Sequence, residues 1–350
     1  MHGAGGYFVS GSFLSDYITA AWGHQFLAGK AELAPKAARR RDGRCPGVGH
    51  GCGHNLIGTA SCGAAIALKQ AWPDMPGTVA VMGTPAEEGG GGKIIMLEKG
   101  AFKGVDASMM FHPSFRYDIG SPSLAAAMMT FRFHGRAAHG AVDPHRGINA
   151  ADAAMLTFAG INAFRQHITS DARIHGVIKH TGDKANITPD YSEIDMVVRA
   201  ATREYMEELV ERVLDCARGA SLMTRATFEV ERGMTYYDSR QCDSYDYLAR
   251  ENFAKLGIKA EQPGGDVPKA SGDGGNVSHA IPHLGITAAI SDHVINGHSV
   301  EWRDASISPR GHQAMMESAK VLAMTMCDLL YRPDVLERIR AEHKVVTARK

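Results

Sequence analysis

Apolar runs and helical periodicity alternate along most of the chain. Short runs such as Gly77–Gly83 and Val105–Phe111 are continuously apolar, as strands buried on both faces of a parallel sheet are. Small and aliphatic residues from Leu56 to Gln70 are typical of a helix packed closely on such a sheet. In chain order, strands are predicted at 77–83, 105–111 and 285–290, and helices at 56–70, 94–99, 245–256 and from Pro309 to about Leu330. This alternation indicates an α/β fold.

The two ends of the chain have weaker patterns. Residues 1–46 show only fair apolar periodicity and include a basic run, Lys36–Arg44, of the kind that is usually solvated. The charged stretch Asp334–Lys350 predicts an exposed helix or a fraying tail. We assign no chemistry to residues 1–46.

The pattern changes near Pro122. From there the chain has the order β-α-β-β-α-β, which is the split β-α-β sandwich. Its strands are predicted at 128–133, 174–180, 191–200 and 226–231, and its helices at 147–168 and, behind a Thr202 cap, at 203–217. We therefore expect an inserted domain at 122–233, between two segments of a catalytic domain at 1–121 and 234–350.

Length and composition narrow the class of protein. A chain of 350 residues with 44% hydrophobic residues can fill two cores. Lys+Arg and Asp+Glu both number 38, so no global field favours nucleic acid or an anionic membrane, and a small-molecule partner is expected. No apolar run reaches the ~18 residues of a membrane span, and the start lacks the order of a signal peptide, which favours the cytoplasm. The six cysteines lack the density of a disulfide scaffold, so we take them as reduced.

A glycine-rich stretch before the first predicted helix carries a thiol and an imidazole that could face one ion. Cys52 and His54 flank a glycine that lets the backbone turn. Alone, this pair favours a metal site and a structural loop about equally. Glu88 and His112 follow neighbouring strands, where open α/β sheets place ligands, and His298 lies on a distant loop. Five such groups exceed what one tetrahedral ion needs, so two ions sharing a bridging water is the simplest interpretation.

Adjacent glutamates offer two different roles. If Glu88 binds metal, Glu87 is left beside the shared water, where it can take a proton during attack and give it to the leaving nitrogen. An isolated Glu-Glu pair is more often two solvated charges, but this one follows a buried strand and Pro85 and precedes four glycines. Gly89–Lys93 does not fit a phosphate loop, since no Ser or Thr follows Lys93, and the chain has no Gly-x-Ser-x-Gly nucleophile motif.

Three residues of the inserted domain could contact a substrate. His139 lies just past an edge strand, although a lone histidine is more often an ordinary surface or core residue. Asn186 and Arg199 supply an amide and a fork-shaped cation, which suit a substrate carboxylate or a developing oxyanion.

Several motifs occur together, in one order, in a known family. From about Pro46 to Leu330 the chain resembles the dinuclear metallo-aminoacylase and carboxypeptidase family, specifically its amidohydrolase branch with p-aminobenzoyl-glutamate hydrolase-like proteins and aminoacylase-like dipeptidases. The resemblance is carried by Gly-His-Gly-Cys-Gly-His-Asn at 49–55, Thr-Pro-Ala-Glu-Glu-Gly at 84–89, Phe-His-Pro at 111–113, Gly-Arg-Ala-Ala-His-Gly at 135–140, Gly-Ile-Asn-Ala-Ala-Asp-Ala at 147–153, Gly-Asn-Val-Ser-His-Ala-Ile-Pro at 275–282 and Gly-His-Ser at 297–299.

The resemblance implies a three-layer αβα metallohydrolase domain interrupted by a ferredoxin-like lid that commonly dimerises. The implied ligands of two divalent metal ions are Cys52, His54, Glu88, His112 and His298. Glu87 would be the general base, and His139 would stabilise the tetrahedral intermediate, in its own or in the partner protomer's site. Asn186 and Arg199 would contact substrate.

The sequence leaves two hypotheses for function. In the first, a metal-activated water and Glu87 hydrolyse the amide bond of a small dipeptide or N-acyl amino acid with a free carboxylate. In the second, the protein is a catalytically impaired metal-binding homodimer, because residues 1–46 depart from the family pattern. A mixed Cys/His/Glu shell suits zinc or manganese, with cobalt as a further option.

Overall fold

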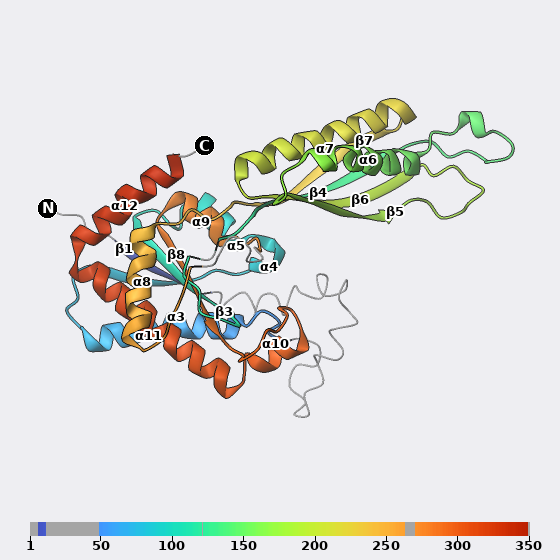
Figure 1. Ribbon diagram of the computed structural model, residues 1–350. Coiled ribbons are helices and arrows are strands. Elements are labelled where there is room, and N and C mark those ends of the chain that lie inside the picture. The colour runs from blue at the N-terminus through green and yellow to red at the C-terminus, as the bar shows by residue number, and fades with distance from the viewer. Residues whose placement is uncertain (1–5, 12–48, 121, 263–269, 349–350) are drawn as a thin grey trace. The chain divides into compact units, whose positions relative to one another are not determined.

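The computed structural model describes residues 6–11, 49–120, 122–262 and 270–348 (Figure 1). The chain divides into two compact units, each with its own hydrophobic core. Unit 1 comprises Met1–Pro122 and Ser239–Lys350, and unit 2 comprises Ser123–Asp238. Among the described residues, no helix has both the length and the apolarity needed to cross a bilayer.

A four-stranded sheet in the order β2-β1-β3-β8 forms the centre of unit 1 (Figure 1). The strands are β1 Gly6–Gly11, β2 Thr78–Gly83, β3 Val105–Ser114 and β8 His283–Ala289. All three pairings are parallel. Because β1 pairs with both β2 and β3, it lies between two strands that follow one another in the sequence. The sequence pattern did not predict β1.

The place of β2 shows that one expectation was wrong. β2 lies at the edge of the described sheet, and each of its six residues is exposed or half-buried, with Val81 39% exposed. Its apolar run therefore does not reflect burial on both faces, because β1 takes the interior position beside β3. β3 is longer than expected and runs through His112 to Ser114, so His112 belongs to the strand itself.

Helices pack against this sheet. They are α3 His54–Ala71, α4 Glu87–Gly90, α5 Gly92–Glu98, α8 Asp243–Lys255, α9 Gly274–Ala280, α10 Val300–Ala305, α11 Pro309–Tyr331 and α12 Pro333–Ala348. α3 and α11 contact each other and β3, and they bury Leu56, Phe111 and Leu322 to 1% exposure or less. α5 and α9 share a smaller apolar cluster around Phe102 and Val277. The main core therefore holds the start of α3 and the end of β3 in fixed positions.

The C-terminal segment is a packed helix, which corrects the expectation of an exposed helix or a fraying tail. Val335, Leu336 and Ile339 on α12 lie in the main core, at 5% exposure or less. His343 Nε2 lies 2.7 Å from the backbone oxygen of Ser278, and because a carbonyl oxygen can only accept, Nε2 donates this hydrogen bond. Part of the segment's charge faces solvent, and part makes contacts within unit 1, as in the Arg340–Asp106 ion pair. The sequence pattern also did not predict α9 and α10, which have seven and six residues.

Unit 2 contains two α-helices, two short 3-10 helices at Pro144–Arg146 and Arg165–His167, and an antiparallel sheet in the order β5-β6-β4-β7. Its elements are β4 Ala125–His134, α6 Ala150–Phe164, β5 Arg173–His180, β6 Tyr191–Ala200, α7 Arg203–Thr224 and β7 Thr227–Tyr236. α7 continues past the expected end at 217 because Ala217 and Ala220 are both buried, and it ends before Arg225 at φ 67°. β7 runs to Tyr236, so the unit ends at Asp238 rather than at 233.

The two faces of the unit 2 sheet differ in polarity. On β6, residues alternate strictly between buried and half-buried, and Ile194 and Val198 pack with α6 and α7 in the core. The other face carries charged side chains, among them Glu193 and Asp195 on β6 and Lys179 on β5. One face of this sheet is therefore packed and the other is solvated, as is common for antiparallel sheets.

Candidate metal centre

The loop before α3 places Cys52 and His54 close together. Gly53 between them has φ 76° and forms the N-cap of α3. A Cβ atom on Gly53 would lie 2.9 Å from Cγ of Pro113, which follows His112 on β3. Glycine is therefore required here both for the backbone conformation and for the approach of the loop to β3. His54, the first residue of α3, is 3% exposed.

The glycine run after Glu87 and Glu88 has a structural reason. Gly89 and Gly91 have φ of 99° and 59°, conformations that favour glycine. A Cβ atom on Gly92 would lie 1.6 Å from the backbone oxygen of Pro85. The run thus folds the chain back tightly behind the two glutamates, and this turn leads from β2 to α5.

The ligand-type side chains of unit 1 converge, although they come from distant parts of the chain. Cys52 Sγ lies 3.3 Å from His112 Nε2. Glu88 Oε1 lies 3.8 Å from His54 Nε2 and 3.3 Å from His298 Nε2. Two donors bound to one tetrahedral zinc ion lie about 3.5 Å apart, given bond lengths of about 2.0–2.3 Å. The observed separations have this size.

The donor atoms form three overlapping groups, each within 4.8 Å. The groups are Cys52, His54 and His112; Cys52, Glu88 and His298; and His54, Glu87 and Glu88. Cys52, His54 and Glu88 each belong to two groups. Six donors sharing members in this way are more than one tetrahedral ion can use and are suited to two neighbouring ions.

Protonation states around Cys52 fit a bound cation. Burial raises the pKa of Cys52 to about 12, while a hydrogen bond with His298 opposes the rise. The thiol would therefore stay protonated at neutral pH unless a cation stabilised the thiolate. His112 Nδ1 donates to the backbone oxygen of Pro113 at 2.7 Å, which leaves the lone pair of Nε2 facing Cys52. This is the tautomer that binds a metal through Nε2.

His298 reaches the cluster through its backbone. Its N–H donates to the carbonyl oxygen of Gly51 at 2.8 Å, and a Cβ atom on Gly51 would lie 3.4 Å from Cα of His298. His298 has φ 60°, and its side chain is 44% exposed. The loop before α10 is therefore fastened to the Cys52 loop, so a candidate ligand almost 250 residues away in sequence joins the same group.

Glu87 lies between the cluster and a buried ion pair. Its Oε2 atom lies 3.9 Å from His54 Nε2. Burial raises the pKa of Glu87 to about 7; the positive charge of Lys93 opposes this, and Asp273 and Glu88 add to it. Lys93 and Asp273 form a salt bridge of 2.7 Å in which both side chains are 1% exposed.

Sequence reasoning missed this ion pair. It considered Lys93 only as part of a phosphate loop, and it gave Asp273 no role. The only available signal was that Asp273 stands two residues before the Gly-Asn-Val-Ser-His-Ala-Ile-Pro motif. A separation of 180 residues leaves no local pattern that could pair the two.

The other three predicted site residues belong to unit 2. His139 accepts hydrogen bonds at Nδ1 from the backbone N–H groups of Ala141 and Val142, at 3.2 and 3.3 Å. Its loop pairs with the loop of Asn186, because the backbone N–H of Gly140 donates to the backbone oxygen of Asn186 at 2.9 Å. His139 and Asn186 are thus neighbours near the start of β6.

Arg199 lies near the opposite end of β6 and is not brought together with His139 and Asn186. It lies eight positions along the strand from Tyr191, or roughly 26 Å away. Its Nε donates to His175 Nε2 at 3.4 Å, and burial lowers its pKa. Unit 2 therefore carries two separate polar sites.

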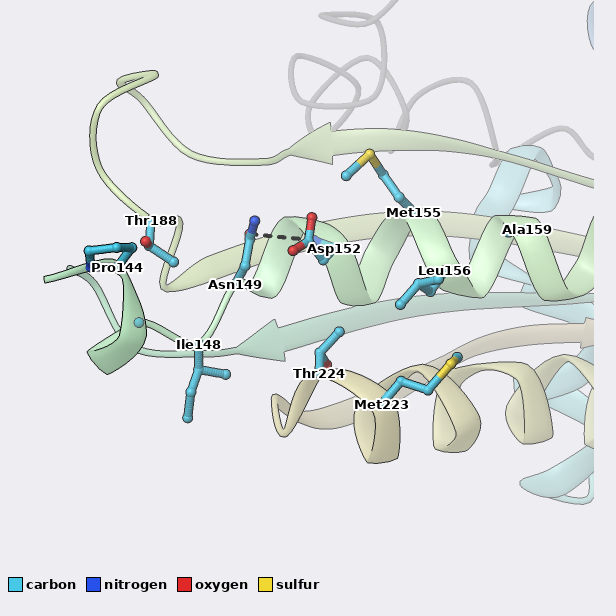
Figure 2. Close-up of a pocket in the computed structure, with 11 residues that line it drawn as sticks. Pro144, Ile148, Asn149, Asp152, Met155, Leu156, Ala159, Thr188, Met223 and Thr224 are labelled. Atoms are coloured by element: carbon cyan, nitrogen blue, oxygen red, sulfur yellow. Dashed lines mark hydrogen bonds between the residues drawn. The ribbon is translucent and has the colours of Figure 1, made fainter. Parts of the chain in front are cut away.

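A pocket elsewhere in unit 2 is lined by none of these three residues. It has a volume of about 740 Å³ and lies beside the start of α6 and the end of α7 (Figure 2). Asn149 on its wall caps α6 by accepting from Ala151 N–H at 2.9 Å. The polar group there already serves the helix, and the pocket does not mark the predicted site.

Comparison with known proteins identifies the family. The model of Peptidase family M20/M25/M40 matches residues 25–236, more than half of the chain. The chain belongs to peptidase family M20/M25/M40.

The chain is also similar to several proteins whose names describe an activity. Human Xaa-Arg dipeptidase is 37% identical over 308 residues, which cover 86% of this chain and 70% of the relative. One of the two p-aminobenzoyl-glutamate hydrolase subunits of Escherichia coli strain K12 is 38% identical over 213 residues, 59% of this chain and 44% of the relative. A dinuclear metal-binding peptidase of the M20 family from Bacillus subtilis matches with a TM-score of 0.67 at 17% identity, over 94% of this chain and 82% of that one.

Membership of the M20 family confirms the family resemblance and the α/β class expected from the sequence. It also confirms that the protein is a metal-dependent hydrolase of amide bonds. At 17% identity, the likeness to the solved peptidase concerns the fold alone.

Proposed function

We propose that this M20 protein is a dinuclear metallohydrolase that cleaves the amide bond of a small dipeptide or N-acyl amino acid with a free carboxylate. One observation carries the proposal: a thiol, three imidazoles and a carboxylate from four separate segments converge beside a second carboxylate, Glu87. Polar groups that lose water on folding cost free energy unless they gain partners. Bound cations would be such partners for these six groups.

The proposed metal ligands are Cys52, His54, Glu88, His112 and His298. The donor set suits two divalent ions, zinc or manganese, with cobalt also compatible. When bound, the ions would supply Lewis acidity that activates water and polarises the substrate carbonyl. The thiol of Cys52 favours zinc or cobalt over harder ions. The carboxylate of Glu88 is a hard ligand that also suits manganese.

The chain's own residues account for the proton transfer. Glu87 would accept a proton from the attacking water and return it to the leaving nitrogen, since it lies next to Glu88 and within 3.9 Å of His54. His139 would donate a hydrogen bond to the oxyanion, for which its Nε2 is free to carry the proton while Nδ1 accepts backbone bonds. Asn186 and Arg199 would contact the substrate, and because they lie near opposite ends of β6 they would contact one substrate only from two different copies of the chain.

The substrate class is supported by the names of the relatives. One relative is a dipeptidase, and another belongs to a hydrolase of p-aminobenzoyl-glutamate, an amide of an amino acid. The balance of 38 basic and 38 acidic residues is consistent with a small substrate rather than nucleic acid.

A homodimer formed through unit 2 is part of the proposal. β5 ends the described sheet of unit 2, and its outer positions include Val177 and Ile178 at 60% and 44% exposure. An edge strand presents backbone donors and acceptors that can pair with another strand. Because His139 and Arg199 lie far apart in one unit, a dimer would also allow two copies to complete one substrate site.

The test is an activity screen of the zinc- or manganese-loaded protein on dipeptides and acylated amino acids, with bound metal and oligomeric state measured in parallel. Glu87→Gln should keep two metal ions per chain but lose about 10³-fold in kcat, because the proton acceptor is gone. Glu98→Gln, on the exposed side of α5, is the matched control and should retain full activity. Normal turnover in Glu87→Gln would remove Glu87 from the mechanism. Two bound ions with no hydrolysis of any substrate would favour the catalytically impaired homologue instead.

A further inference from the structure

A buried ion pair closes the turn that carries Glu87 and Glu88. Lys93 Nζ lies 2.7 Å from Asp273 Oδ1, and the backbone N–H of Lys93 donates to Asp273 Oδ2 at 3.0 Å. Both oxygens of one carboxylate therefore bind the same residue, once through its side chain and once through its backbone. Asp273 thereby fixes the position of the α5 N-terminus as well as the lysine side chain.

The same segment also contacts the other end of the turn. Gly272, the neighbour of Asp273, lies so close to Glu87 that a Cβ atom there would be 3.1 Å from Glu87 Oε1. Residues 272–273 thus contact the turn at Glu87 and again at Lys93, six residues later. The glycines between these points have no side chains that could hold the turn from within. Backbone hydrogen bonds from Gly90 and Gly92 to the Ala86 oxygen, at 3.0 and 3.4 Å, hold the turn from within, and the side-chain contacts that hold it come from residues 272–273.

Two titratable groups, Glu87 and His283, lie near the pair. His283 lies next to this segment, since a Cβ atom on Gly274 would be 3.6 Å from His283 Nε2. His283 Nδ1 is engaged with Ser108 Oγ at 2.8 Å. Burial lowers the pKa of His283 to about 4, so this imidazole is neutral and does not compete for Asp273.

A buried ion pair is a poor device for stability alone. Its desolvation cost commonly cancels its Coulomb attraction, and a well-packed apolar replacement is often as stable or more so. The same charges do fix geometry, because each must face the other to avoid being buried without a partner. The position of this pair, behind the two glutamates, makes geometry the relevant property.

We propose that Lys93 and Asp273 are positioning residues that hold the Glu87–Glu88 turn in the shape required for metal binding and proton transfer. The inference rests on the proposed function for its catalytic part, and on the ligand cluster alone for its metal-binding part. Neither residue touches the reacting atoms. Their effect passes through the glycine turn.

The experiment separates positioning from stability with an apolar double variant. Lys93→Met/Asp273→Leu removes both charges and keeps the buried volume similar. Each variant is compared with the native chain in urea unfolding, in zinc affinity measured by competition with a chromophoric chelator, and in kcat and KM. The exposed pair Lys259–Glu261, at 2.5 Å, gives the control Lys259→Met/Glu261→Leu, which should match the native chain in all readouts.

We expect the double variant to unfold at a urea concentration close to that of the native chain. Its kcat should nevertheless fall about 100-fold, the effect of a displacement of about 1 Å, with KM within about twofold. Its zinc affinity should fall about 10-fold, because Glu88 shifts with the turn. Native kcat and native zinc affinity in a stably folded double variant would overturn the proposal.

A second variant covers the case in which the double variant does not fold. Asp273→Glu keeps the charge pair but lengthens the acid by one methylene, so it should displace the turn and lower both kcat and zinc affinity. Native values for both in Asp273→Glu would equally overturn the proposal. If the native chain hydrolyses no substrate, the proposed function fails, and the positioning role is then decided by zinc affinity alone.

Discussion

One carboxyl group in each unit shows how the two units differ, because their pKa values are shifted in opposite directions. In unit 1, Asp246 on α8 is 1% exposed, and burial raises its pKa to about 7. In unit 2, Glu193 on β6 accepts from the Tyr191 hydroxyl at 2.6 Å and pairs with Lys179 at 2.9 Å, and these contacts lower its pKa to about 2. Similar carboxyl groups thus shift in opposite directions, according to whether burial or partners dominate.

This contrast follows from the architecture of the two sheets. Unit 1 packs helices around a parallel sheet, so polar groups near its core lose water whether or not they find a partner. Unit 2 packs its helices against one face of an antiparallel sheet and leaves a charged ladder in solvent. Groups that have lost water can have shifted pKa values and can be held in fixed positions, and a metal site requires both. The solvated ladder contributes little more than solubility and modest pairing energy.

The largest expected effect is on the core of unit 2 and tests whether the two units are energetically separate. Phe131 is fully buried and stacks on Phe133 and Phe228, with ring centroids 6.5 and 6.2 Å away. Phe131→Ala should cost about 3–5 kcal/mol of unfolding free energy in unit 2. Zinc bound per chain should not change, since all proposed ligands lie in unit 1. Urea unfolding and metal analysis measure the two quantities.

Leu222→Ala is the control for Phe131→Ala, because Leu222 on α7 is 82% exposed and should be nearly neutral. If Phe131→Ala lost its bound zinc when unit 2 unfolds, the two units would unfold as one, and the contrast drawn between them would not hold for stability.

The next effect concerns Asp246 and has a defined sign. The folded chain keeps this proton up to about pH 7, whereas an unfolded aspartate releases it near pH 4. The stability from the bound proton is therefore complete below about pH 4 and is lost as pH rises towards 7. Asp246→Asn mimics the protonated form and should be more stable than the native chain at pH 8, by at most about 4 kcal/mol.

Urea unfolding from pH 4 to pH 8 checks the Asp246 prediction, and the difference between the variant and the native chain should vanish at the acid end. Glu251→Gln, on the exposed side of α8, should show no such pH dependence. Parallel curves for Asp246→Asn and the native chain would mean that Asp246 does not hold its proton in the folded state.

The smallest effect is expected at Glu193, with the opposite sign. Its folded pKa lies below the unfolded value near 4.5, so its stability is present above about pH 4.5 and is lost as pH falls towards 2. Lys179 is about half exposed, so solvent screens the pair. Glu193→Gln should cost about 1 kcal/mol at pH 7 and nothing near pH 2. Thermal unfolding at the two pH values measures this, and Glu208→Gln on exposed α7 is the control. A cost that persists at pH 2 would point to lost packing instead of lost charge.

Much of the fold could be predicted because its signals are local. The helix from Leu56, the strands at 105–111 and 191–200 and the helix from Pro309 each follow from the periodicity and caps of one short window. The candidate ligands could be proposed only because a Cys-Gly-His turn and a Glu-Glu pair occur together with several further motifs in the order of a known family, since each motif alone has other common uses. Confirmation of the family came from the comparisons, and the role of each site residue is a proposal.

The sequence by itself determined most of the longer helices and strands and which short stretches are candidates for chemistry, because those properties depend on neighbours a few residues away. Tertiary structure alone decided that β1 lies between β2 and β3, that α12 buries one face, that His298 returns to Gly51, and that Lys93 meets Asp273. Each of these depends on which groups lose water together once distant segments pack. No window of sequence contains that information, because desolvation is a property of the whole folded chain.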